Sequence, residues 1–148
     1  MDGLDRKILH SLSNDARRPL ARVAEELQIA QTTLHQRVRR LEEQGVITGS
    51  RLVVDWDQAG LPVAALISIE VTRRGSLADT AERISANPYV MSCFAITGEF
   101  DLLLVVRAES SAHLGEILED LRNQGLGHSR TVVVLSTFYE NRMPPIEG

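Results

Sequence analysis

Apolar residues in the first third of the chain recur at the spacing of helix faces. They form three stripes: Leu4, Ile8 and Leu12; Leu20, Val23, Ala24 and Leu27; and Leu34, Val38 and Leu41. Pro19 precedes the second stripe, where a first-turn proline is tolerated, and Gly45 follows the third, where a glycine commonly ends a helix. Helices of this length need a packing partner in water. The pattern therefore predicts a three-helix domain whose second and third helices span about 20–27 and 31–43.

Beyond Gly45 the helical spacing gives way to short apolar runs. Two such runs flank the turn-prone Thr-Gly-Ser at 48–50, a pattern that predicts a β-hairpin, or wing. The polar stretch that follows them is typical of a linker and ends at Gly60. We therefore expect two domains, residues 1–60 and 61–148.

The second half alternates apolar runs of strand length with stripes of helical spacing. Strands are predicted at 63–72, 89–97, 101–108 and 130–138, and helices at 76–87 and 110–124. The resulting order, βαββαβ, is that of a ferredoxin-like domain. The fold class expected is α+β: a winged helix-turn-helix followed by a ferredoxin-like βαββαβ domain.

Three of these strands are apolar on both faces. Alternate residues of a strand point to opposite sides of a sheet, and here neither set is polar. The paired sets are Val63, Ala65, Ile67 and Ile69 against Ala64 and Leu66; Leu102, Leu104 and Val106 against Leu103 and Val105; and Val133 and Leu135 against Val132, Val134 and Phe138. Two helices cover only one side of such a sheet. We therefore predict a homo-oligomer, at least a dimer whose sheets pack face to face.

Composition narrows the class of protein. A hydrophobic fraction of 43% and a charged fraction of 24% are typical of a globular protein. No apolar run reaches the roughly 18 residues that a membrane helix needs, and the N-terminus lacks the layout of a signal peptide. The single cysteine, Cys93, cannot form an internal disulfide. We therefore expect a cytoplasmic protein that makes no contact with a membrane.

The net charge of -4 is unevenly distributed along the chain. Residues 1–60 carry nine basic and nine acidic side chains, whereas residues 61–148 carry seven and eleven. Residues 31–41 include three arginines and no acid. Because the local field decides whether phosphates are bound, the first half is compatible with DNA binding despite the acidic total.

The helices predicted at 20–27 and 31–43 have the spacing of a helix-turn-helix, with the motif at about 20–39. A solvated surface helix would also carry glutamine and arginine, but the preceding helix and the lack of acids favour recognition of double-stranded DNA. Arginine can bond guanine, and glutamine can bond adenine. The expected DNA-binding residues are Gln31, Thr32, Thr33, His35, Gln36, Arg37, Arg39 and Arg40, with Arg17, Arg18, Arg22 and Arg51 as phosphate contacts.

Specific residues give the chain a family resemblance. They are Leu4-Asp5, Ile8-Leu9, Leu12, Val23-Ala24, Thr33-Leu34, 37–42 and 45–47 in the first half, and 98–101 and 131–135 in the second. With them the sequence resembles, over nearly its whole length, the Lrp/AsnC transcription regulators, or feast/famine regulatory proteins. Members usually have Gly in the turn and Ser capping the recognition helix, where this chain has Gln28 and Ala30. A left-handed non-Gly residue costs about 1 kcal/mol and a missing cap about as much, so either Gln31 or Thr32 caps the helix or the turn differs.

The resemblance also implies a ligand site. In the family, a Gly-acidic-aromatic-Asp turn lines pockets between dimers that bind free amino acids or related metabolites. Carried onto this sequence, the effector-binding residues are Gly98, Glu99, Phe100, Asp101 and Thr131, with both acids facing an ammonium group and backbone donors near Gly98 taking a carboxylate. Such a small-molecule effector would shift assembly among dimers, octamers and larger forms. Without the resemblance, this string predicts only a hairpin turn.

Two other functions stay open at this point. An enzyme similar to the sirohaem decarboxylases, which share this architecture, would need His113 and Arg107 beside a macrocycle. A ligand-gated assembly module without DNA binding would fit the departures at Gln28 and Ala30. Otherwise the sequence shows no catalytic constellation, metal-ligand spacing or cofactor motif, and the pair Ser110-Ser111 is expected to cap the helix at 110–124. We therefore expect a regulator that is not an enzyme, whose effector and operator the sequence does not name.

Overall fold

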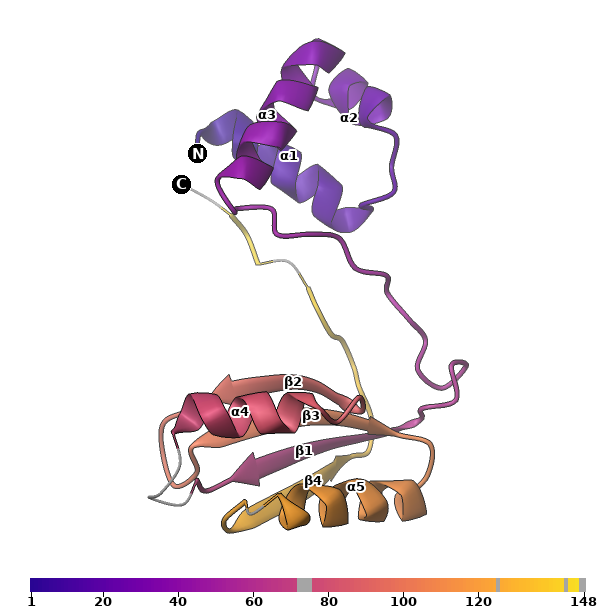
Figure 1. Cartoon of the computed structure of the whole chain (residues 1–148). Helices are drawn as coiled ribbons and strands as arrows, with labels where there is room; N and C mark the ends of the chain where they lie inside the picture. Colours follow the sequence, from indigo (N-terminus) through magenta and orange to yellow (C-terminus); the bar gives the residue numbers. More distant parts are fainter. Residues whose placement is uncertain (72–75, 125, 143, 147–148) are drawn as a thin grey trace. The chain divides into compact units, whose positions relative to one another are not determined.

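The computed structural model describes residues 1–71, 76–124, 126–142 and 144–146. The chain divides into two compact units, one of Met1–Val53 with the C-terminal segment from Tyr139, the other of Val54–Phe138 (Figure 1). The domain boundary near Gly60 stays a prediction. Within the described residues, no helix is long and apolar enough to cross a lipid bilayer.

The first unit contains the three predicted helices, α1 (Gly3–Asn14), α2 (Leu20–Glu26) and α3 (Gln31–Glu43). Their apolar stripes meet in a core formed by Ile8, Val23, Ala24 and Leu34. Asp2 begins α1: its side chain accepts hydrogen bonds from the backbone of Leu4 and Asp5, and the Asp5 side chain accepts one from the Asp2 backbone. This reciprocal cap satisfies backbone donors that a helix start leaves unpaired. The three-helix prediction is confirmed.

The turn between α2 and α3 keeps a left-handed residue although no glycine is present. Gln28 has φ 55°. Its N–H donates to the Glu25 carbonyl, and the Ile29 N–H donates to the Ala24 carbonyl. This bond pair is the Schellman motif, which glycine usually completes. Helix α3 starts after Ala30, whose side chain makes no capping bond, so the first of the two alternatives, a cap from Gln31 or Thr32, is not what the structure shows.

The predicted wing at 46–54 is also wrong. These residues form no strand. The N–H groups of Val46 and Ile47 both donate to the Leu41 carbonyl and thereby terminate α3, so they are not available to pair with a second strand. Leu52 and Val53 are 76% and 97% exposed. A two-stranded hairpin is marginal unless it has an apolar surface to pack on, which explains why this apolar run stays extended.

The second unit is a four-stranded antiparallel sheet with two helices, in the predicted βαββαβ order. The elements are β1 (Val63–Ile69), α4 (Leu77–Ser85), β2 (Val90–Ala95), β3 (Leu102–Ala108), α5 (Ser111–Asn123) and β4 (Ser129–Val134). The strands lie in the order β2-β3-β1-β4, with β1 and β3 in the centre. Strands β1 and β4 are shorter than predicted; residue 72 lies outside the described residues, and Leu135 and Phe138 lie beyond the last pairing with β1. Ser110 caps α5 as expected, accepting from the His113 N–H.

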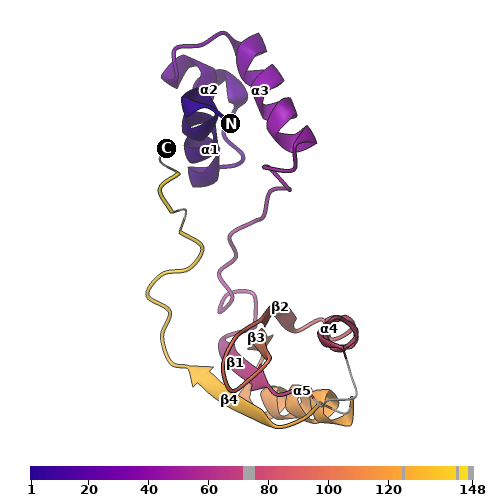
Figure 2. The ribbon, with the colours of Figure 1, turned by 90° about the vertical axis from the view of Figure 1, so that its left-hand side faces the viewer.

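Both helices lie on the same face of this sheet (Figures 1 and 2). Between helices and sheet is the core, with Ile67, Leu104 and Val106 from the strands and Ile84 and Ile117 from the helices. Over the opposite face lies no helix of the described residues (Figure 2). Leu66, Leu103 and Val105 are half-buried there, and Phe94 and Val132 are 52% and 51% exposed.

Candidate DNA-binding and ligand-binding sites

Helix α3 presents one face away from the core of its unit. Residues follow one another at about 100° around a helix, so Thr32, Gln36 and Arg39 lie roughly opposite the buried Leu34 and Leu41. The outward residues are exposed, and so are Gln31 and His35 at the edges of this face; Thr33 is half-buried. We define Thr32, His35, Gln36 and Arg39 as the outward face of α3. Four of the expected DNA-binding residues are thereby brought together.

Two further arginines of α3 turn toward α1 instead. The guanidinium of Arg37 donates to the carboxylates of Asp2 and Asp5, the latter at 2.9 Å. Arg40 donates to the second Asp5 oxygen at 2.8 Å. The Asp5 side chain is fully buried, whereas those of Arg37 and Arg40 are 26% and 45% exposed. These bonds fasten the N-terminal turn of α1 to the middle of α3.

The electrostatics of this cluster follow from its hydrogen bonds. The bond from Arg37, followed by that from the Asp5 backbone, lowers the pKa of Asp2 to about 2. Burial opposes ionisation of Asp5, but the Asp2 backbone, Arg37 and Arg40 outweigh it and hold the pKa of Asp5 below its ordinary value. Asp2 and then Asp5 raise the pKa of Arg37. The cluster is therefore a charged, hydrogen-bonded network at neutral pH.

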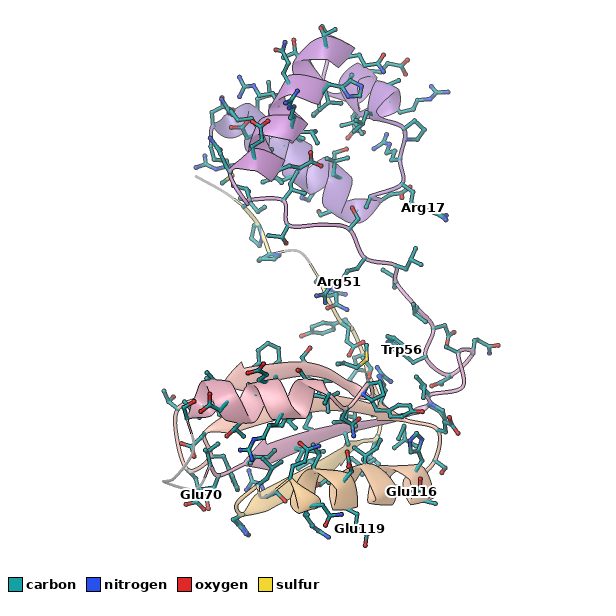
Figure 3. All side chains as sticks on the ribbon, viewed as in Figure 1. Arg17, Arg51, Trp56, Glu70, Glu116 and Glu119 are labelled. Atoms are coloured by element: carbon teal, nitrogen blue, oxygen red, sulfur yellow. The ribbon has the colours of Figure 1, made fainter. Side chains whose placement is uncertain are left out.

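The remaining arginines near α3 differ in how they are held. Arg39 is paired with Glu43 one turn later, at 2.8 Å, and both side chains are largely exposed. Arg18 and Arg22 are paired with Glu26 and Glu25 of α2. Arg17 and Arg51 are exposed and extend away from the backbone (Figure 3). Exposed ion pairs contribute little to stability, so the paired arginines can exchange their carboxylates for DNA phosphates.

The Gly98–Asp101 turn lies between β2 and β3, as expected. Gly98 has φ 127°, a conformation that other residues avoid. The Asp101 carboxylate accepts a hydrogen bond from the Val71 N–H at 2.7 Å, and the Asp101 N–H donates to the Ile69 carbonyl. Asp101 therefore fixes the end of β1 with one of its oxygens. Glu99 is exposed.

Aromatic and basic side chains gather beside this turn. Phe100 is buried, its ring is stacked 6.1 Å from that of His128, and the Arg130 guanidinium lies 5.2 Å from the Phe100 ring centre. Thr131 pairs with Ile67 of the core, so its side chain is on the helix-covered face, opposite to that of Arg130. The structure thus brings together Gly98–Asp101 and not Thr131. Sequence reasoning missed Arg130, although strand alternation next to Thr131 would have placed it on the other face.

The residues of the enzyme alternative lie apart. Arg107 alternates with Val106 and Ala108, which face the helices, so its side chain is on the open face of the sheet, 5.7 Å from the Trp56 ring centre. His113 lies on α5, with its ring 4.3 Å from that of Tyr89. Arg107 and Trp56 line a cleft of about 450 Å³ that His113 does not reach. The Arg107 side chain and His113 therefore lie on opposite sides of the sheet and do not share this cleft.

The comparisons with known proteins agree with this architecture. Residues 1–42 match the AsnC-type helix-turn-helix domain, and residues 64–144 match the Lrp/AsnC ligand binding domain. The chain belongs to the Lrp/AsnC family. An uncharacterized HTH-type transcriptional regulator of Pyrococcus abyssi is 35% identical over 95% of this chain and 96% of its own. The HTH-type transcriptional regulator LrpA of Mycobacterium tuberculosis is 28% identical, covering 96% of this chain and 95% of its own.

Solved structures extend the likeness to the whole chain. A feast or famine regulatory protein of M. tuberculosis, complexed with L-methionine, has a TM-score of 0.92 at 28% identity, covering 97% of this chain and 98% of that one. The Lrp/AsnC protein described here is therefore a DNA-binding transcription regulator with a ligand-binding domain, and its family is not one of enzymes.

Proposed function

We propose that this Lrp/AsnC protein is a sequence-specific regulator that inserts α3 into the major groove of a pseudo-palindromic operator. The observation that supports this most is the outward face of α3, where Thr32, Gln36 and Arg39 are exposed on a helix-turn-helix. In this proposal the exposed Arg17 and Arg51 hold phosphates, and phosphate contacts make binding fall steeply with salt. Arg37 and Arg40 support the helix from the α1 side.

The operator is bound by a dimer or a larger assembly formed through the open face of the sheet. An apolar surface is formed there by Leu66, Leu103 and Val105 at its centre and by Phe94 and Val132 on the outer strands, and no helix in the described part of the chain covers it. A sheet that is apolar on both sides needs a cover on both sides. A second copy of the same sheet supplies that cover and brings two recognition helices to adjacent turns of DNA.

An amino acid is the effector class we propose, at the end of the sheet formed by the Gly98–Asp101 turn. A similar protein is complexed with L-methionine. In this chain, Glu99 and the second oxygen of Asp101 are acceptors for an ammonium group, and Arg130 is a cation for a carboxylate. Thr131 contributes only if the ligand reaches the helix-covered face. Binding at this end would bias assembly by its different affinity for each form.

Fluorescence anisotropy on DNA from upstream of the protein's own gene tests both parts of this proposal. Binding that resists excess non-specific DNA, and that Gln36→Ala weakens, is the expected result for the regulator. A shift of the titration with a pool of the twenty amino acids is expected for the sensor. Glu99→Gln should abolish that shift, whereas Glu116→Gln, which changes another exposed acid, on α5, should leave it unchanged (Figure 3). If competitor DNA removes the binding completely, the proposal of a sequence-specific regulator is contradicted. If Glu99→Gln shows the same shift with amino acids as the unsubstituted protein, the proposed effector site is contradicted.

A further inference from the structure

The outward face of α3 offers hydrogen-bonding groups of two different kinds. Thr32 and Gln36 lie in the first two turns, and within the described part of the chain neither side chain is engaged in a hydrogen bond or an ion pair. Arg39 lies in the third turn and is paired with Glu43. Because the N-terminal residues of a recognition helix contact the base edges, Thr32 and Gln36 are the side chains best placed to read bases.

Two of the three arginines of α3 are held by α1 and do not belong to its outward face. Arg37 is bonded to two carboxylates of α1, and one of these, Asp5, is completely buried. Arg40 shares Asp5. Moving Arg37 into the groove would leave a buried carboxylate with fewer donors, which is unfavourable. The bidentate arginine–guanine contact, the commonest specific contact in the major groove, is therefore not available from Arg37.

We propose that each half-site of the operator carries an adenine opposite Gln36, read through its N6 and N7 by the Gln36 amide. Thr32, one turn earlier on the same face, packs its methyl group against the methyl of a neighbouring thymine. The chain thus selects A·T base pairs at the positions under its first two turns, and Arg39 contacts phosphate. This inference rests on the proposed function, since it requires α3 to enter the major groove.

The amide of Gln36 suits adenine by its geometry. A primary amide presents one acceptor and two donors, and adenine presents the N7 acceptor beside the N6 donor. A bidentate pair of this kind discriminates against a wrong base by about tenfold or more. A glutamate at the same position has acceptors only, and in the major groove it matches the N4 donor of cytosine. The base preferred at this position should therefore follow the residue placed at 36.

Selection from a randomised double-stranded DNA library with the full-length protein tests the proposal. For the unsubstituted protein we expect one adenine per half-site, preferred about tenfold over the other bases. Gln36→Ala should flatten the preference at that position alone, and Gln36→Glu should move it toward cytosine. Because Gln36 is exposed and unbonded, neither change should alter the melting temperature. Gln44→Ala, at the residue that caps the C-terminal end of α3, is the matched control and should leave the selected site unchanged.

The possible results separate this inference from the proposed function. One result would overturn the inference and leave the proposed regulator intact: a preference for guanine in each half-site that Arg39→Ala removes and Gln36→Ala keeps. Retention of the adenine in Gln36→Ala would overturn it as well. A library in which the unsubstituted protein enriches no sequence would overturn the sequence-specific regulator, and the inference with it.

Discussion

Replacing Gln28 by glycine should stabilise the first unit. Gln28 adopts φ 55° in the turn before α3, and a non-Gly residue in this left-handed region is disfavoured by about 1–2 kcal/mol. Glycine removes that cost, but it also gives the unfolded chain more freedom, which offsets roughly 0.4–1 kcal/mol. The two backbone bonds of the turn are unaffected, because both use main-chain atoms. The difference between the two ranges is roughly 0–1.6 kcal/mol, so we expect a net gain of about 0.8 kcal/mol in the free energy of unfolding, or roughly 3–6 °C in melting temperature.

The reverse substitution at the end of α3 is the control. Gly45 has φ 69° at the equivalent position of a second Schellman motif, and a Cβ there would meet no atom within 4 Å. Gly45→Gln should therefore lower the free energy of unfolding by about as much as Gln28→Gly raises it, for the backbone reason alone. Thermal and urea unfolding followed by circular dichroism measure both, and hydrogen exchange at α2 and α3 reports the first unit by itself.

Opposite signs for the two substitutions are the expected result. If Gln28→Gly leaves the melting temperature unchanged or lowers it while Gly45→Gln lowers it, the left-handed assignment at Gln28 is refuted. Adding Ala30→Ser to Gln28→Gly should give about 1 kcal/mol more, because α3 begins without a side-chain cap. An absence of any gain from serine would show that the N-terminal donors of α3 are already satisfied.

Three further predictions follow from the charged network and the sheet. Asp5→Ala should lower the free energy of unfolding by about 3 kcal/mol, because it leaves Arg37 and Arg40 without their buried partner. Glu43→Ala removes only an exposed pair and should change the free energy of unfolding by less than about 0.5 kcal/mol in the same urea titration. Asp2 has its pKa lowered to about 2, so its stabilisation is complete above its unfolded value of 3.8 and is lost as the pH falls toward 2; Asp2→Asn should flatten the decline in unfolding midpoint across this interval. Leu103→Asp on the open sheet face should yield monomers by sedimentation at micromolar concentration, and Glu116→Gln should not; a dimer in both would exclude that face as the interface.

The sequence predicted the helices and strands because each buries a continuous apolar stripe or face in its own unit. It predicted more strand than the structure contains at two places, for the same reason. The apolar run at 52–54 and the residues after Val134 have strand-like composition, but neither has a partner strand in the structure. Strand propensity describes how well side chains fit a paired, half-buried surface and cannot by itself provide that surface.

The candidate sites were predictable to a different extent. Helical periodicity alone placed Thr32, Gln36 and Arg39 on one face, because that face depends only on the helix. It also put Arg40 there, whereas in the structure Arg40 is bonded to Asp5 of α1. The roles of Arg37 and Asp101 depend on contacts between residues far apart in the sequence: Arg37 with Asp5, and Asp101 with Val71. No local pattern reveals such pairs. In both cases the sequence singles out the residue but not the partner that it bonds.

The Asp5 cluster also changes how the charge of α3 should be weighed. The three arginines between 31 and 41 made this helix look strongly cationic, yet Asp2 and Asp5 balance Arg37 and Arg40, and Glu43 faces Arg39. What remains on the outward face is mainly hydrogen-bonding capacity, in Thr32 and Gln36. Charge attracts any DNA equally, whereas hydrogen bonds to base edges distinguish one sequence from another. Because the arginines of this recognition helix are paired with carboxylates of the same unit, its contacts with DNA favour selectivity between sequences. Most of the protein's non-specific affinity for DNA must then come from basic residues outside α3, such as Arg17 and Arg51.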